Sequence, residues 1–203
     1  SWCLSVGMQA AKVDTLSVHS DAMNKEVQVI TICPDKAMAG EKCPVLYLLH
    51  GYGGNAGTWL GINPELPQIA DKEGIIFVCP DGKNSWYWDS PLNKEYRYET
   101  FVSKELVNYI DKNFTTKVER GGRAITGLSM GGHGSLWLSI RHKDVFGGGG
   151  SMSGGLDIRP FPNNWEMKKQ LGEEASNKQR WDEHTVINQL DKIKNGDLAV
   201  IID

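Results

Sequence analysis

The sequence predicts an α/β fold: a mostly parallel, doubly wound sheet with helices on both faces, formed as a single domain over residues 1–203. From residue 44 onward, apolar runs typical of buried strands alternate with segments of helical periodicity. Glycines cluster at 51–57, 121–134 and 147–155, which indicates tight turns and close backbone contacts. A chain of 203 residues suits one domain with a well-buried core.

The first part of the chain predicts strands and one short helix. Residues 26–32 alternate polar and apolar side chains, and 44–49 form an apolar run typical of a central strand buried on both faces. The elements expected are strands at 13–19, 26–32 and 44–49, a short helix at 66–72, and a buried strand at 75–79 that ends at Pro80-Asp81-Gly82.

The second part predicts a long helix first, because apolar residues recur at helical spacing over 98–114. The elements that follow are a strand at 123–126, a helix at 132–142, a glycine-rich strand at 145–152, short helices at 165–171 and 182–193, and a strand at 198–203 with a buried pattern.

The stretch "GLSMGGHG" (127–134) contains the pattern G-x-S-x-G and indicates Ser129 as a nucleophile. This motif is functional only between a strand and a helix, on a sharp turn that raises the hydroxyl above the sheet. The apolar residues before Gly127 and the amphipathic segment after Gly131 meet both requirements without using the motif itself. The context therefore favours a serine hydrolase.

An acyl-transfer enzyme also needs backbone N–H groups that stabilise an oxyanion. The residue after the nucleophile, Met130, supplies one candidate N–H group. The glycine-rich stretch "LLHGYGGNAGTW" (48–59) follows a buried strand, and the N–H group of Tyr52 is the candidate second donor.

Three stretches carry a resemblance to a known family. "PVLYLLHGYGGNAGTW", "VCPDGKNSWYWDSP" and "GLSMGGHGSLWLSIRHKDVFGGGGSMSGGLDI" resemble the esterase D and feruloyl esterase group of α/β-hydrolases, which includes S-formylglutathione hydrolases and tributyrin esterases. The resemblance covers about residues 12 to 203. It implies a carboxylester hydrolase that forms an acyl-enzyme without a cofactor, with Ser129 as nucleophile and Tyr52 and Met130 as oxyanion donors.

A serine nucleophile needs a histidine base and a carboxylate, which follow the serine in this fold. The acid is expected after the seventh strand and the histidine after the eighth, whereas the sequence ends at Asp203. We therefore expect the chain to lack its C-terminal portion, including the last strand and helix, and to be inactive alone. Asp203 and Asp157 are weak candidates for the acid, and Asp157 is more simply explained as a turn cap.

No histidine in the sequence is a convincing base. His133 lies one helical turn after Ser129, so we expect it to pack within the helix rather than align with the hydroxyl. His50 leads into the oxyanion loop and is expected to make a scaffold hydrogen bond. His19, His142 and His184 are each most simply surface residues.

Aromatic residues suggest how a substrate is bound. Trp86, Tyr87 and Trp88 follow the fourth strand, and with Trp59 they could form a platform for an aromatic acyl group or a sugar ring, or simply pack the loop. In the family such features favour feruloyl or acetyl esterases acting on plant polysaccharide decorations. The alternatives are an S-formylglutathione hydrolase or short-chain esterase, and a non-catalytic carbohydrate-binding relative.

Composition gives no indication of a nucleic-acid-binding, membrane-spanning or metal-binding function. A formal net charge of −3 gives no reason to expect a nucleic-acid or membrane partner, and no apolar run approaches the roughly 20 residues of a membrane span. The cysteine spacing does not suit a metal site.

Cys79 is expected to be a buried thiol, whereas Cys33 and Cys43 could form a disulfide across a hairpin. That disulfide would imply an oxidising compartment, and a secreted or periplasmic location is favoured over a cytoplasmic one. We also expect self-association through the open edge of the sheet.

Overall fold

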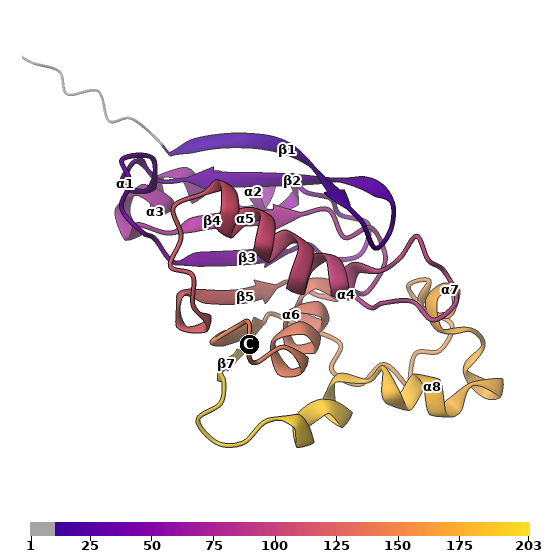
Figure 1. Ribbon diagram of the computed structural model, residues 1–203. Coiled ribbons are helices and arrows are strands. Elements are labelled where there is room, and N and C mark those ends of the chain that lie inside the picture. Colours follow the sequence, from indigo (N-terminus) through magenta and orange to yellow (C-terminus); the bar gives the residue numbers. More distant parts are fainter. Residues whose placement is uncertain (1–10) are drawn as a thin grey trace, which may run out of the picture.

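The computed structural model describes residues 11–203 and contains a seven-stranded sheet in the order β1-β2-β4-β3-β5-β6-β7 (Figure 1). The strands are β1 Lys12–Ser20, β2 Lys25–Cys33, β3 Val45–Leu49, β4 Ile76–Pro80, β5 Arg123–Gly127, β6 Gly148–Ser151 and β7 Ala199–Ile202. The β1–β2 and β2–β4 pairs are antiparallel, and every other pair is parallel. The predicted mostly parallel sheet is confirmed.

Helices cover both faces of this sheet. The helical elements are α1 Asp35–Met38, α2 Thr58–Ile62, α3 Leu66–Glu73, α4 Tyr98–Thr100, η1 Phe101–Leu106, α5 Val107–Asn113, η2 Arg120–Gly122, α6 Met130–Arg141, α7 Met167–Leu171, η3 Glu174–Ser176, α8 Lys178–Glu183 and η4 Val186–Lys192. Alternate strand residues divide the core, since Leu48 packs with α3 whereas Tyr47 belongs to the larger cluster that contains α5 and α6. This two-sided coverage is the doubly wound arrangement.

The predicted helix over 98–114 is present but is not a regular α-helix. Its middle part, η1, is a six-residue π-helix between α4 and α5. Within it, Ser103 Oγ donates to the Glu99 carbonyl at 2.6 Å. Apolar spacing does not distinguish a π-helical segment from an α-helical one over so few turns, because the two differ by one residue in hydrogen-bond register.

The last strand was predicted to be buried, but it is exposed. All four residues of β7 are exposed, including Ile201 at 75%. Its backbone pairs with β6, and it is the outermost strand of the described sheet. The apolar sequence indicated a strand correctly, but composition does not reveal whether another element covers it.

The possible Cys33–Cys43 disulfide is absent, and both residues are buried free thiols. The hairpin that suggested it does not form, because β2 pairs with β1 and β4 rather than with β3. Instead, the backbone of Cys43 forms an isolated parallel β-bridge with Thr116. Burial raises the pKa of both thiols, and it raises the pKa of Cys79 to about 12, so all three stay protonated at neutral pH.

Within residues 11–203, no helix combines the length and apolar character that crossing a bilayer requires. The same part of the chain contains no group of three or more His, Cys, Asp or Glu side chains placed to hold a metal ion.

Candidate active site

Ser129 lies on a sharp turn between β5 and α6. Its backbone has φ 56° and ψ −115°, a left-handed conformation that costs a non-glycine residue on the order of 1–3 kcal/mol. A Cβ at Gly127 would lie 2.1 Å from the Gly131 carbonyl oxygen, and a Cβ at Gly131 would lie 2.1 Å from that of Leu49. Both glycines are therefore required by backbone contact, and the predicted strand–turn–helix geometry is present.

Backbone hydrogen bonds hold this turn in place. The Ser129 N–H group donates to the Met152 carbonyl at 2.9 Å, and the Ser129 carbonyl accepts from the His133 N–H group at 3.0 Å. The Gly131 N–H group donates to Leu128 O at 2.8 Å. With its backbone fixed on both sides, Ser129 lines a pocket beyond the carboxyl ends of the strands.

The loop after β3 passes directly across the serine turn. A Cβ at Gly51 would lie 3.1 Å from the Leu128 carbonyl oxygen and 3.4 Å from Ser129 Cβ. Met130 is the first residue of α6, so its N–H group has no acceptor within the helix. Among residues 11–203, the N–H groups of Tyr52 and Met130 donate to no backbone carbonyl. This geometry is compatible with the predicted oxyanion hole.

Side chains beneath the loop after β3 hold it rigidly. His50 Nε2 accepts from the Gly82 N–H group at 2.9 Å, so Nδ1 carries the proton and donates to Gly51 O at 2.7 Å. The Tyr87 hydroxyl donates to His50 O at 2.9 Å, and Trp59 Nε1 donates to Leu49 O at 2.9 Å. His50 thus has the predicted scaffold role, and Trp59 supports the loop instead of lining the pocket.

The pocket at Ser129 has a volume of about 210 Å³ and a largely aromatic wall. It is lined by Tyr52, Trp86, Ser129, Ser153, Gly154, Gly155, Asp157, Ile158, Phe161, Trp165 and Met167. The Trp165 ring lies 6.2 Å from Trp86 and 5.5 Å from Phe161, measured between centroids. Sequence reasoning missed Phe161 and Trp165, for which the available signal was the presence of large aromatic residues in a polar segment after β6.

The predicted aromatic platform is only partly correct. Trp86 lines the pocket, but Tyr87 and Trp88 are fully buried behind it. A Cβ at Gly134 would collide with the Tyr87 ring at 2.2 Å, which shows how closely that ring packs on α6. Trp88 packs against His133. For Tyr87 and Trp88, packing of the loop is therefore the correct alternative.

His133 is enclosed by tryptophan rings. The imidazole lies edge-on to Trp86 and Trp88, with centroid distances of 5.1 Å to each, and stacks on Trp137 at 6.2 Å. The side chain is completely buried, and this burial lowers the pKa of His133 to about 3. Such a neutral, enclosed imidazole fits the predicted packing role and would be a poor general base.

The two weak candidates for the acid differ in position. Asp157 lines the Ser129 pocket, but its carboxylate binds the Arg159 guanidinium at 2.9 and 3.0 Å and also accepts the Arg159 N–H group. These hydrogen bonds lower the pKa of Asp157 and give it the predicted turn-capping role. Asp203 is exposed, and its backbone pairs with Ser151 and Ser153. None of the five histidines lines this pocket within the described chain.

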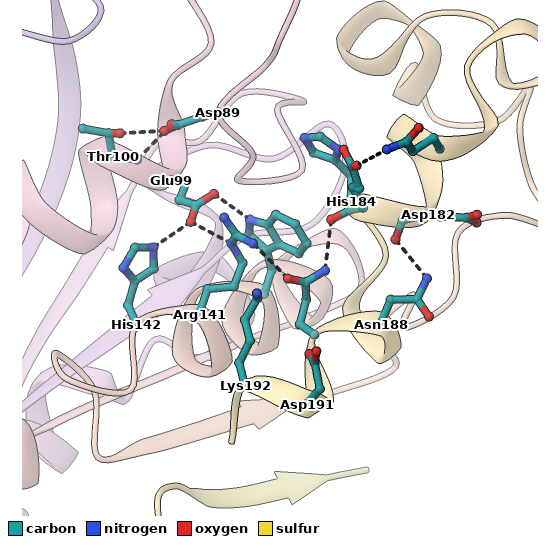
Figure 2. Close-up of a pocket in the computed structure, with 14 residues that line it drawn as sticks. Asp89, Glu99, Thr100, Arg141, His142, Asp182, His184, Asn188, Asp191 and Lys192 are labelled. Atoms are coloured by element: carbon teal, nitrogen blue, oxygen red, sulfur yellow. Dashed lines mark hydrogen bonds and ion pairs between the residues drawn. The ribbon is translucent and has the colours of Figure 1, made fainter. Parts of the chain in front are cut away.

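A larger pocket of about 680 Å³ lies among α6, α8 and η4 and does not contain Ser129 (Figure 2). Figure 2 shows Glu99 between His142 and Arg141, with hydrogen bonds of 2.6 and 2.9 Å.

The histidines predicted at the surface differ in their positions. His184 stacks on Trp137 at 5.7 Å between ring centroids, and burial lowers the pKa of His184. His142 and His184 are therefore half-buried packing residues and not simple surface residues. His19 is exposed on β1 beside Glu26, as predicted.

A mostly parallel sheet of this strand order, with a serine on the turn between β5 and α6, defines the α/β-hydrolase class. Comparison with known proteins identifies the family. Residues 20–203 match the Putative esterase family, to which the chain belongs.

Several relatives carry names that describe ester hydrolysis. The chain is 29% identical to an acetyl esterase of Caldicellulosiruptor saccharolyticus over 70% of its own length and 56% of the relative's. It is 33% identical to an endo-1,4-beta-xylanase/feruloyl esterase of Xylanibacter ruminicola over 57% of its length and 17% of the relative's. The chain thus spans about half the length, or less, of these curated relatives.

An S-formylglutathione hydrolase from Agrobacterium tumefaciens shares the fold. The two structures superpose with a TM-score of 0.76 at 19% identity, over 97% of this chain and 90% of the other. At this identity the likeness extends to the fold alone.

Proposed function

We propose that the protein is a serine carboxylester hydrolase that works through an acyl-enzyme. The observation that carries this proposal is Ser129 in its left-handed turn, at a pocket that the loop of Tyr52 also lines. Ser129 Oγ attacks the ester carbonyl carbon, and the N–H groups of Tyr52 and Met130 bind the resulting oxyanion. The alcohol then leaves, and water hydrolyses the acyl-enzyme to release the acid.

Full turnover requires a base that removes the proton from Ser129 Oγ. None of the described residues that line the pocket is a histidine, and Asp157 is already paired with Arg159. We therefore expect these 203 residues alone to turn over esters slowly, with the missing base as the reason rather than a malformed nucleophile.

The pocket favours an ester with an aromatic acyl group. Trp86, Phe161 and Trp165 offer ring faces beside Ser129 that a feruloyl group could contact. The names of the acetyl and feruloyl esterase relatives support feruloyl or acetyl esters as substrates, and we propose plant polysaccharides as their carriers. The alternatives are S-formylglutathione or another short-chain ester, and carbohydrate binding without catalysis.

Covalent labelling tests the nucleophile directly. A fluorophosphonate should phosphonylate Ser129 slowly, because no described pocket residue removes the hydroxyl proton, but faster than the other serines, as measured by mass spectrometry of the intact protein and of its peptides. The variant Ser129→Ala should take up no label, whereas Ser153→Ala, which changes another serine of the same pocket, should be labelled at the wild-type rate. A folded wild-type protein in which Ser129 is labelled no faster than its other serines would favour the binding alternative.

Acylation by activated esters then tests the acyl preference. The initial rate of p-nitrophenol release from p-nitrophenyl ferulate should exceed the rate from p-nitrophenyl acetate. Trp165→Ala should reduce this ratio by about two- to tenfold, because an aromatic pair contributes about 0.5–1.5 kcal/mol. A ratio that is unaffected by Trp165→Ala would favour the short-chain alternatives.

A further inference from the structure

We propose that Asn84 and Glu166 are positioning residues that couple the aromatic wall of the pocket to the oxyanion loop. This inference rests on the proposed function, because it concerns how the same site is held. Neither side chain is among the residues that line the pocket at Ser129. Each acts through a hydrogen bond to a neighbouring residue.

A continuous chain of hydrogen bonds joins the two parts of the site. The Gly53 N–H group, next in sequence to Tyr52, donates to Asn84 Oδ1 at 2.8 Å. The Asn84 amide in turn donates from Nδ2 to Glu166 Oε2 at 3.0 Å. Glu166 directly follows the wall residue Trp165, so Asn84 connects the predicted oxyanion donor to the wall.

The two turns that contain or adjoin Asn84 and Glu166 have strained backbones. Trp86 and Tyr87 have φ of 57° and 59°, and Trp165 and Glu166 have φ of 51° and 57°. Two consecutive non-glycine residues with positive φ are costly and persist only where the surroundings hold them. The two turns hold one another, since Trp86 Nε1 donates to Trp165 O at 3.0 Å beside the Asn84–Glu166 contact.

The polarity of the Asn84 amide is set by its two partners. A backbone N–H group can only donate and a carboxylate can only accept, so the oxygen faces Gly53 and the nitrogen faces Glu166. Glu166 also accepts from Lys169 at 2.5 Å, and the hydrogen bonds from Lys169 and Asn84 lower the pKa of Glu166. Glu166 is therefore a carboxylate at neutral pH.

The arrangement has a consequence for substrate selection. An acyl group that packs on Trp165 stabilises the turn at 165–166, and the same turn presents Glu166 to Asn84. Asn84 then fixes Gly53, and with it the direction of the Tyr52 N–H group. Filling the aromatic wall thus strengthens the contacts that hold the Tyr52 loop in place.

A double-mutant cycle at these two positions tests the coupling. Asn84→Asp keeps an acceptor for Gly53 but sets a second carboxylate against Glu166. Glu166→Gln alone keeps an acceptor for Asn84 and serves as the matched control. The two changes together restore complementarity, because a glutamine amide can donate to a carboxylate.

Two readouts are needed, the exchange rate of the Gly53 amide hydrogen by NMR and the rate at which a fluorophosphonate labels Ser129. We expect Asn84→Asp to accelerate Gly53 exchange and to slow labelling, each about tenfold, which is the scale of one charge-assisted hydrogen bond. Glu166→Gln should change either rate by less than about twofold alone but should rescue most of the loss caused by Asn84→Asp. The Ser129 amide, bonded to Met152, reports that the fold is intact.

Several results would overturn the proposal. Unchanged Gly53 exchange in Asn84→Asp would mean that Asn84 does not hold the loop. A defect that Glu166→Gln fails to rescue would limit Asn84 to a local contact without coupling to the wall. If wild-type Ser129 is labelled no faster than other serines of the protein, the proposed function fails, whereas the exchange cycle still decides whether Asn84 and Glu166 position the loop.

Discussion

At the scale of single residues, the site depends on glycines at positions where the backbone leaves no room for a side chain. Ser129 adopts a conformation suited to glycine, while Gly127 and Gly131 provide the space that its turn needs. The backbone of β3 approaches α6 so closely that a methyl group at Gly131 would meet the carbonyl oxygens of Leu49 and His50. The same contact positions the loop of Tyr52, which follows β3. Replacing the Gly131 hydrogen atom with a methyl group would therefore affect both folding and the proposed oxyanion hole.

Gly131→Ala tests this requirement. We expect a loss of about 3 kcal/mol in the free energy of unfolding, because the new Cβ would lie 2.1 Å from Leu49 O, against backbone that cannot rotate away. Urea unfolding followed by circular dichroism measures the change. Gly61→Ala is the matched control, since a Cβ on this exposed residue of α2 meets nothing within 4 Å, and a small gain in stability is expected. Equal effects at the two positions would contradict the packing argument.

At the scale of elements, the sequence predicted strands and helices more accurately than their surroundings. The strand expected at 44–49 is β3 Val45–Leu49, and the one expected at 75–79 is β4 Ile76–Pro80. The helix expected from residue 132 begins at Met130, since the turn at Ser129 leads straight into it. Apolar runs and glycine positions are local signals, and they suffice for these elements and for the motif around Ser129.

Long-range packing was harder to predict. The exposure of β7, the burial of Trp88 and the position of Trp165 each depend on which distant segment lies alongside. Residues 153–167 contain no regular strand or long helix, so no periodicity indicated that Phe161 and Trp165 face Ser129. A local sequence pattern identifies a strand or helix but not the distant segment that packs against it.

The exposed edge of β7 leads to a prediction for a protein of these 203 residues. Its apolar side chains and its outer backbone, which pairs with no strand among residues 11–203, offer a template for a second chain, so we expect concentration-dependent self-association. Ile201→Lys should shift the mass measured by light scattering toward the monomer, because a charge on an edge strand opposes pairing. Val118→Lys changes another highly exposed apolar residue away from β7 and should have no effect. A monomeric wild-type protein at high concentration would refute this prediction.

At the scale of the whole molecule, one aromatic cluster connects parts of the chain that are distant in sequence. His133 on α6 contacts Trp86 and Trp88 from the turn after β4, and it stacks on Trp137. Trp137 stacks in turn on His184, which follows α8. The pocket wall, the nucleophile helix and the segment after β6 thus share a single buried core. The protonation state of one imidazole at its centre therefore affects the stability of the entire fold.

The pH dependence of unfolding follows from His133. Its pKa of about 3 in the folded protein lies below the value of about 6.5 expected in the unfolded chain, so between these values the unfolded chain binds the extra proton. The stabilisation is complete above pH 6.5 and is lost as the pH falls toward 3, by about 1.4 kcal/mol per pH unit. From pH 7 to pH 5 the wild-type protein should lose about 2 kcal/mol through this residue.

His133→Phe should remove that part of the pH dependence of the free energy of unfolding measured in urea titrations, whatever its effect on absolute stability. Trp88→Phe disturbs the same cluster but keeps the imidazole, so its slope should stay close to wild type. Equal slopes in the wild type and His133→Phe would mean that the buried imidazole does not govern the acid sensitivity of the fold.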